Sequence, residues 1–77
     1  MTTTLVEATR RARLGNLRNG ALFRTPDGVL AVKSEYRYSD GVDTQSLCVL
    51  LESGEYAHFP KKDMELVYEL KLTKGVA

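Results

Sequence analysis

The only histidine and the only cysteine of the chain, His58 and Cys48, are the residues whose types could support catalysis. A histidine within hydrogen-bond reach of a thiol can act as its base and make the sulfur a nucleophile. The turn at Ser53 and Gly54 predicts a hairpin that puts Cys48 opposite Phe59, which offsets His58 toward the other face of the sheet. We therefore predict no Cys–His pair. His58 is expected to be a half-exposed strand residue and Cys48 a small core side chain.

Metal and cofactor sites are not expected either. A structural zinc site needs a cluster of histidines and cysteines, and this chain has one of each. No other group of residues has the spacing of a catalytic site. The sequence predicts a protein that is not an enzyme and that uses no cofactor and no metal.

Tyrosines are the next residues that could carry a function. Four are present: Tyr36, Tyr38, Tyr56 and Tyr68. Aromatic rings with cations beside them are how small β-barrels stack nucleobases. The nearby cations are Lys33, Arg37, Lys61 and Lys62. The alternative, which we favour, is that the tyrosines are core and rim residues of a small barrel that has no tryptophan.

The net charge of +1 hides an uneven distribution. Residues 1–24 hold five arginines against one acidic residue, whereas residues 25–60 hold two basic residues against six acidic ones. Arg10, Arg11 and Arg13 make the N-terminal segment basic. Such a segment can be an arm that binds nucleic acid. It can equally dock on the acidic body of its own chain or of a neighbouring chain, and we favour this second interpretation.

The length of 77 residues corresponds to one small domain. A domain of this size buries only about 60% of the surface that its unfolded chain exposes, so it often needs a crosslink or a partner. Neither a disulfide nor a structural zinc supplies that crosslink here, and we therefore expect a homo-oligomer. No apolar run has the length of a membrane span, and no apolar signal core follows the N-terminal arginines. Together with the lone cysteine, this favours the cytoplasm.

The elements that would position these residues are centred on residues 28–51. Over residues 29–38 the side chains alternate, so that Lys33 and Tyr36 fall on opposite faces of a strand with one buried face. Residues 46–51 are apolar at nearly every position, which predicts a central strand covered on both faces. Shorter elements complete the pattern: strands over residues 21–25, 55–59 and 64–70, and a 3₁₀ turn over residues 60–63.

Five short antiparallel strands in meander order, with a 3₁₀ turn before the last, predict a mainly β fold. We expect a small five-stranded SH3-like barrel over residues 17–72. Residues 1–16 are expected to form a short helix, capped by one of Thr2, Thr3 or Thr4 with Glu7 three positions after Thr4, or to be flexible. Residues 73–77 are expected to be a loose tail. An open five-stranded sheet capped by the N-terminal helix is the alternative.

The central stretch resembles a group of short, uncharacterised phage and prophage proteins. The shared pattern is a strand of the form Gly-x-x-Ala-x-Lys-Ser/Thr-Glu-Tyr, a glycine-containing loop, a second strand, and Ser-Gly-Glu with an aromatic residue a few positions on. The matching residues are Gly28, Ala31, Lys33, Ser34, Glu35, Tyr36, Gly41, Ser53, Gly54, Glu55 and Phe59. The resemblance covers about residues 20–70. It departs from the group at residues 60–63, which replace a longer glycine-rich segment.

The resemblance implies a context and no catalytic residue. It implies a small phage accessory protein in the cytoplasm of an infected bacterium, and small proteins of that kind often bind and block a host component, including defence systems. We therefore expect a non-enzymatic binding protein that acts as a homo-oligomer on a host protein or a small ligand. The alternative is a nucleic-acid-binding barrel that uses the arginine-rich N-terminus and surface tyrosines, although the acidic middle of the chain opposes contact with phosphates. Neither interpretation involves a membrane.

The candidate binding residues combine the basic N-terminus, the charged part of the long strand and the aromatic positions: Arg10, Arg11, Arg13, Lys33, Glu35, Tyr36, Arg37, Tyr38, Tyr56 and His58. Lys33 and Glu35 are two positions apart, so they share a strand face and can pair. An exposed pair of this kind contributes less than about 1 kcal/mol. A pair that is desolvated at a subunit boundary would instead be a site candidate.

Overall fold

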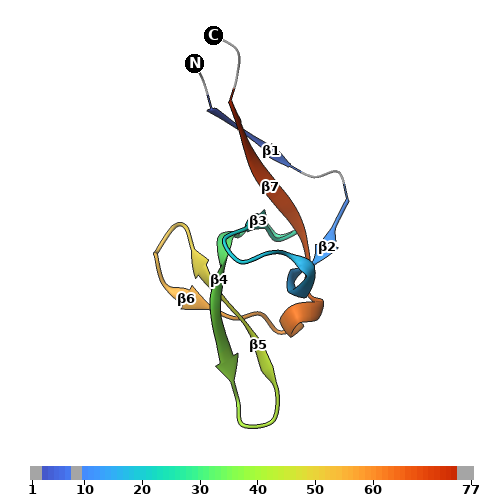
Figure 1. Cartoon of the computed structure of the whole chain (residues 1–77), viewed down its shortest axis with the longest axis vertical. Coiled ribbons are helices and arrows are strands. Elements are labelled where there is room, and N and C mark those ends of the chain that lie inside the picture. The colour runs from blue at the N-terminus through green and yellow to red at the C-terminus, as the bar shows by residue number, and fades with distance from the viewer. Residues whose placement is uncertain (1–2, 8–9, 75–77) are drawn as a thin grey trace.

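A computed structural model describes the backbone of residues 3–7 and 10–74 (Figure 1). The strands are β1 (Thr3–Glu7), β2 (Ala12–Arg13), β3 (Leu22–Arg24), β4 (Leu30–Ser39), β5 (Thr44–Leu50), β6 (Tyr56–Ala57) and β7 (Leu66–Lys74). Two 3₁₀ turns accompany them, η1 (Leu14–Asn16) and η2 (Lys62–Met64). The fold is mainly β, as the sequence predicts. Within the described ranges no helix has the length and apolar character needed to cross a membrane.

The strands form an open antiparallel sheet in the order β1-β7-β3-β4-β5-β6, and β2 pairs with β7 outside that path. The consecutive strands β3 to β6 are neighbours in space, as expected for the first four strands of the predicted meander. The last strand, β7, returns to pair with β3. The turn η2 lies between β6 and β7 at Lys62–Met64, close to the predicted residues 60–63. The sequence therefore predicts the order of elements from β3 onward.

The hairpin of β3 and β4 follows the predicted alternation. Ala21, Phe23 and Thr25 are all buried, because alternate residues of a strand face the same side. The Thr25 hydroxyl hydrogen-bonds the Asp27 carboxylate and accepts a bond from the Val29 N–H at 3.0 Å. Side chains of the turn thus close the hairpin that presents the long strand β4.

The core is small and is built around Phe23 and Leu14, which are almost completely buried. Phe59 packs edge-on against Phe23, with the ring centroids 6.0 Å apart. Cys48 is also completely buried, which confirms the prediction of a core cysteine. The other members of the core are Leu17, Ala21, Ala31 and Val67. Burial of a large apolar side chain contributes roughly 1.5–3 kcal/mol, so Phe23 and Leu14 each contribute substantially to the stability of the fold.

The buried face of β4 is the one that carries Ala31 and Lys33, not the one that carries Leu30. Leu30 is 37% exposed, whereas Ala31 is completely buried. Ala31 stands directly opposite Phe23 on β3, and its small side chain leaves room for the large ring. The fit to the neighbouring strand, and not the hydrophobicity of each residue, therefore decides which face is inside.

The prediction that the apolar run of β5 is a central strand covered on both faces is wrong. β5 lies between β4 and the two-residue β6, which forms one edge of the sheet. Its buried positions include Gln45, Ser46 and Cys48, whereas Leu47 and Val49 are only half-buried. The face of β5 that carries Leu47 and Val49 is therefore only partly covered.

The prediction of a helix within residues 1–16 is wrong for the described residues. β1 pairs with β7, with Thr3 opposite Lys74 and Glu7 opposite Leu70. A short helix with so few apolar groups would not persist alone, whereas pairing with β7 satisfies backbone groups along β1. β1 and residues 70–74 form a two-stranded arm that projects from the body (Figure 1), and we call this arm the ribbon. The predicted loose tail overlaps β7 up to Lys74, and its remaining residues 75–77 lie outside the described ones.

Candidate functional site

Four of the predicted site residues lie together on the exposed side of the sheet. Tyr36 and Tyr38 come from β4 and Tyr56 comes from β6. His58 is the first residue after β6. The rings of Tyr36 and Tyr56 meet edge to face, with centroids 6.4 Å apart. The rings of Tyr38 and His58 stack, with 4.4 Å between centroids and 13° between planes. We call these four residues the aromatic face.

The aromatic face is open to solvent. Tyr36 and Tyr56 are 57% and 58% exposed, and Tyr38 is 39% exposed. The fourth tyrosine, Tyr68, is half-buried, and the Arg24 guanidinium lies 5.1 Å from the centre of its ring. Three of the four tyrosines are therefore not core residues. The structure gathers them on one surface together with the histidine.

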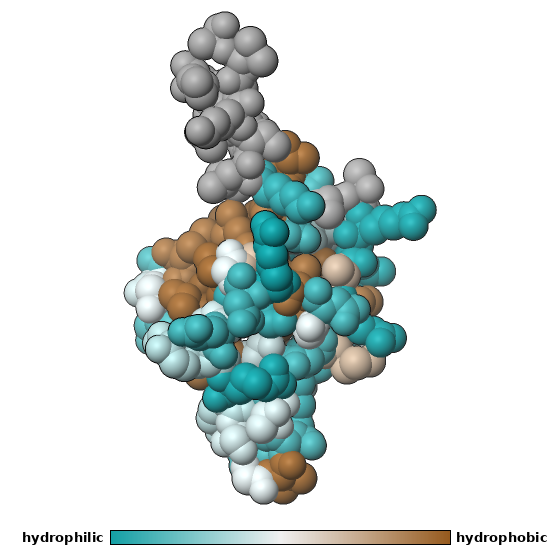
Figure 2. All heavy atoms as spheres, in the orientation of Figure 1, coloured by the Kyte–Doolittle hydropathy of each residue, from teal (hydrophilic) through white to brown (hydrophobic). Residues whose placement is uncertain are grey.

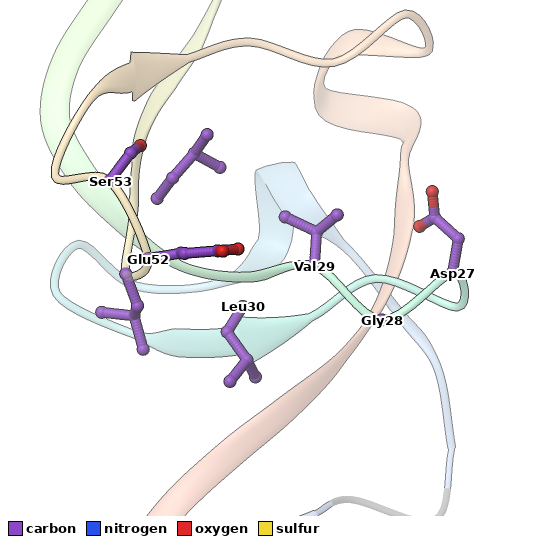
Figure 3. A pocket seen from close by; sticks show the side chains of 8 residues that line it. Asp27, Gly28, Val29, Leu30, Glu52 and Ser53 are labelled. Atoms are coloured by element: carbon purple, nitrogen blue, oxygen red, sulfur yellow. The ribbon is translucent and has the colours of Figure 1, made fainter.

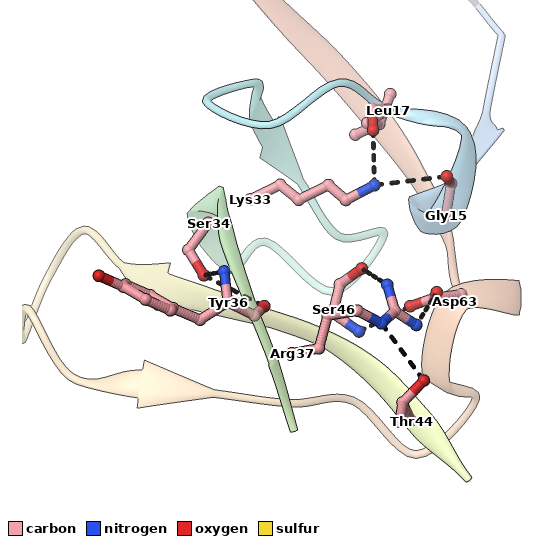
Figure 4. Close-up of polar contacts among 9 residues, drawn as sticks. All are labelled: Gly15, Leu17, Lys33, Ser34, Tyr36, Arg37, Thr44, Ser46 and Asp63. Carbon is pink, nitrogen blue, oxygen red and sulfur yellow. Dashed lines mark hydrogen bonds and ion pairs between the residues drawn. The ribbon is translucent and has the colours of Figure 1, made fainter. Parts of the chain in front are cut away.

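A bulge in β4 explains how the aromatic face is built. β4 pairs regularly with β5 as far as Cys48 and again from Ser46, but three residues of β4 stand opposite the single β5 residue between these positions, Leu47. The Ser34 hydroxyl donates to the Leu47 carbonyl at 2.7 Å. It also accepts from the Tyr36 N–H at 3.1 Å (Figure 4). These bonds satisfy backbone groups that the bulge removes from the hydrogen-bonding pattern between β4 and β5. They also fix the position from which the Tyr36 side chain projects.

The hairpin of β5 and β6 has a wider turn than the sequence predicts. The Leu50 N–H donates to the Glu55 carbonyl at 2.9 Å, so the turn spans residues 51–54 instead of two residues. Cys48 consequently stands opposite Ala57, two residues from its predicted partner. The prediction that the histidine and the cysteine point to different faces does not depend on this register.

Cys48 and His58 are placed in different environments. The Cys48 side chain is buried in the core, whereas His58 is exposed and stacks on Tyr38. Burial raises the pKa of Cys48 to about 11, although the positive charge of Lys33 acts in the opposite direction. The thiol is therefore protonated at neutral pH, and the histidine does not lie beside it as a base.

Lys33 lies on the opposite side of β4 from the aromatic face. It is only 6% exposed, and its ammonium donates to the Leu17 carbonyl at 2.5 Å and to the Gly15 carbonyl at 3.3 Å (Figure 4). These carbonyls belong to η1 and to the residue that follows it, so the buried cation holds this segment against the sheet. Glu35, which precedes Tyr36, is exposed. Among the described residues it forms no ion pair with Lys33.

Arg37 is also engaged within the molecule. Its guanidinium lies 2.8 Å from one carboxylate oxygen of Asp63 in η2 (Figure 4). The other Asp63 oxygen accepts from the Ser46 N–H at 2.8 Å. Partial burial acts to raise the pKa of Asp63, but the hydrogen bonds from Arg37 and Ser46 outweigh it and hold the pKa below the ordinary value of 3.8. Arg37 therefore joins β4 to η2 and is occupied by this contact.

Of the two remaining cations near the tyrosines, one is paired with carboxylates and the other is exposed. Lys62 lies 3.0 Å from Asp43 and 4.0 Å from Asp40, which ties η2 to the loop between β4 and β5. The hydrogen bond to Asp43 and the charges of both carboxylates raise the pKa of Lys62. Lys61 is exposed. Three of the four predicted cations, Lys33, Arg37 and Lys62, are thus engaged within the molecule.

The basic N-terminal residues Arg10, Arg11 and Arg13 are exposed, but the structure does not bring them to the aromatic face. Arg10 and Arg11 lead into β2, which contains Arg13 and pairs with β7. The aromatic face is carried by β4 and β6, on the other side of β3 in the strand order. A single ligand that needs both the arginines and the tyrosines is therefore not favoured.

A hollow between two hairpin turns is a feature that the sequence does not reveal. It has a volume of about 610 Å³ and lies between the turn before β4 and the turn after β5 (Figure 3). Its lining combines aliphatic side chains with two carboxylates: Val29, Leu30, Leu50, Leu51, Asp27 and Glu52. Hydrophobic atoms also gather on the upper part of the body in Figure 2. Aliphatic residues directly beside turns are the one signal in the sequence that could have indicated this surface.

No metal site is formed by the part of the chain that the structure describes, because no three His, Cys, Asp or Glu side chains come together there. The sequence matches no known protein family, and no curated protein and no solved structure shows detectable similarity to it.

Proposed function

We propose that this chain is a non-enzymatic binding protein and that the aromatic face is the surface that contacts a partner protein. The observation that carries the proposal is the exposure of three tyrosines that form contacting pairs on one surface. Exposed apolar surface of this kind marks interaction sites, and tyrosine is enriched among residues that dominate binding energy. The rings already rest against each other, so binding would order few additional side-chain torsions.

The biological role that we propose rests on the resemblance of residues 20–70 to short phage proteins. In this role the chain blocks or sequesters a host component in the cytoplasm of an infected bacterium, with counter-defence as one form of it. It acts as a homo-oligomer. The proposed mechanism is steric: a partner that is bound to the aromatic face cannot use the same surface for its own contacts.

We further propose that β3 to β7 make up a small SH3-like barrel. The meander from β3 to β6, followed by η2 and by a last strand that pairs back with β3, supports this architecture. β1 and β2 are additions to it. In such a barrel the aromatic face lies on the outside of the wall formed by β4, β5 and β6.

Site-specific photo-crosslinking in a bacterial lysate tests the proposed surface. A photoreactive amino acid at position 56 is expected to link the chain to one discrete protein. Position 64 is the matched control, because Met64 is 57% exposed, almost the same fraction as Tyr56, but lies in η2. An excess of unlabelled wild-type chain should suppress the product, whereas an excess of Tyr36→Ala should not. The same products from both positions, or no product from position 56, would exclude the aromatic face as the partner surface.

Binding of single-stranded nucleic acid is the second candidate, and the near-parallel stack of Tyr38 on His58 favours it. Bases stack on exposed aromatic rings with little regard to sequence. The engaged state of Lys33, Arg37 and Lys62 opposes it, because phosphate contacts dominate such affinities. Fluorescence anisotropy with single- and double-stranded oligonucleotides at low salt distinguishes the candidates. An anisotropy that does not change during the titration would exclude nucleic acid as the ligand. Saturable binding that Tyr38→Ala abolishes would instead make nucleic acid, and not a protein, the ligand of the aromatic face.

A further inference from the structure

The ribbon presents an open strand edge. Within the described residues β1 pairs only with β7, and it is the last strand in the order of the sheet. A strand at the end of a sheet leaves one row of backbone N–H and C=O groups without a partner strand. In β1 this row runs over five residues.

The two edges of the sheet differ in how well they are protected. β6 is two residues long, and Pro60 follows shortly after it. β1 is five residues long, with the sequence TTLVE, and contains no proline, lysine or glycine. Its only charged side chain, Glu7, is held by Arg24 on β3 at 2.6 Å. Short strands, lysine and proline are the usual protection of an edge, and β1 has none of them.

The ribbon is also too narrow to be stable by itself. The pairing of β3 with β7 ends at Leu70, whereas β1 continues along β7 to Lys74. Two strands without a third are marginally stable in water. The ribbon projects from the body (Figure 1) and contributes to a longest dimension of 50 Å, against 25 and 21 Å in the other directions. A further strand on the free edge of β1 would give it the support that the body does not supply.

We propose that this further strand is β1 of a second copy. Antiparallel pairing about a two-fold axis needs only the same edge on both copies, and it makes a four-stranded sheet in the order β7-β1-β1-β7. Full overlap places Leu5 opposite the partner's Leu5, and Thr4 opposite the partner's Val6. The inference rests on the proposed function in one respect, the expectation of a homo-oligomer, and it assigns the interface of that oligomer. The aromatic face, which is at the other end of the strand order, stays available in the dimer.

A charge exchange at the paired positions tests the interface. The wild-type chain is expected to have the mass of a dimer by light scattering. The variant Thr4→Lys/Val6→Lys places lysines directly opposite each other and is expected to have the mass of a monomer. The variant Thr4→Glu/Val6→Glu is expected to be monomeric for the same reason. An equal mixture of the two variants should restore the dimer, because each lysine then faces a glutamate.

A cysteine crosslink keeps the inference testable even if the charged variants do not fold. In a Cys48→Ala background, Leu5→Cys is expected to form a disulfide-linked dimer on mild oxidation, because residues directly opposite each other on antiparallel strands are close enough. Val42→Cys is the control, since Val42 is 89% exposed and lies in the loop between β4 and β5. It is expected to form no disulfide-linked dimer over the same time.

A wild-type chain with the mass of a monomer would overturn the β1 interface. So would a dimer that persists in the lysine variant and that Leu5→Cys does not link by a disulfide. Such a result would leave the crosslinking at position 56 unaffected, so the proposed function would stand without this interface. If the dimer is linked through β1 but position 56 gives no crosslinked product, the β1 interface stands and the proposed function fails. The two failures are therefore distinguishable.

Discussion

The two halves of β4 make different contacts although they belong to one strand. Before the bulge, Ala31 and Lys33 face the core and are buried. After it, Tyr36 and Tyr38 face solvent and meet rings of the β6 region. The first half holds the body together, and the second half presents the surface that we assign to binding.

This difference shows that residue type alone does not determine the role of a strand position. The lysine is buried and the tyrosines are exposed, which is the reverse of the usual preference. Lys33 can be buried because its apolar stem crosses the core and its ammonium reaches the carbonyls of Gly15 and Leu17. Among the described residues no such internal partner holds the ring of Tyr36, which rests on another exposed ring.

The largest expected effect concerns the buried half. Lys33→Ala should reduce the free energy of unfolding by about 1–3 kcal/mol, because it leaves the Leu17 carbonyl without its partner in a buried position. Urea denaturation measures the loss. The control is Lys33→Met, which retains most of the apolar stem and removes only the ammonium. A stability equal to that of the wild type in both variants would show that the buried lysine does not hold η1 in place.

The next effect is a pH dependence that comes from the same side of the sheet. The pKa of Cys48 is raised from 9.0 to about 11 in the folded chain. As the pH rises above about 9, the unfolded chain loses this proton first and binds fewer protons than the folded chain, so stability falls until the pH reaches about 11. Below pH 9 the cysteine contributes no such dependence. Denaturation curves at several pH values should show a shallower alkaline decline in Cys48→Ala, and an unchanged decline would contradict the buried thiol.

A smaller effect is expected at the boundary between the halves. Ser34→Ala removes the bonds from the bulge to the Leu47 carbonyl and the Tyr36 N–H, and it should cost about 1 kcal/mol of unfolding free energy. It should also weaken crosslinking at position 56, because Tyr36 loses the contact that fixes its place on the strand. Ser34→Thr, which keeps the hydroxyl, is the matched control. Full crosslinking in Ser34→Ala would show that the bulge does not position the aromatic face.

Local patterns predict the part of the fold whose contacts are local. The hairpin of β3 and β4 could be predicted from its alternation and turn residues, and η2 from the sequence that follows Phe59. The shared face of Tyr56 and His58 follows from their spacing. The register of β6 could not be predicted, because two turn lengths fit the same residues.

Long-range contacts account for what the sequence did not predict. The segment TTLVE has a residue that can cap a helix, and the strand that pairs with it, β7, is at the other end of the chain. The burial of Lys33 depends on carbonyls that lie 16 and 18 residues earlier. The meeting of Tyr36 with Tyr56 depends on the bulge, which hydropathy does not reveal.

The most direct test of the division of β4 is to measure stability and binding together in Tyr36→Ser/Tyr56→Ser. The change removes one exposed ring pair, so the free energy of unfolding should fall by no more than about 1 kcal/mol. Binding to the protein identified by crosslinking at position 56 should be lost in the same sample. Lys33→Met should show the opposite combination. Its free energy of unfolding should be lower, but it should still bind the partner at urea concentrations below its unfolding transition. A tyrosine variant that unfolds, or one that binds its partner as the wild type does, would contradict the assignment of the aromatic face to binding.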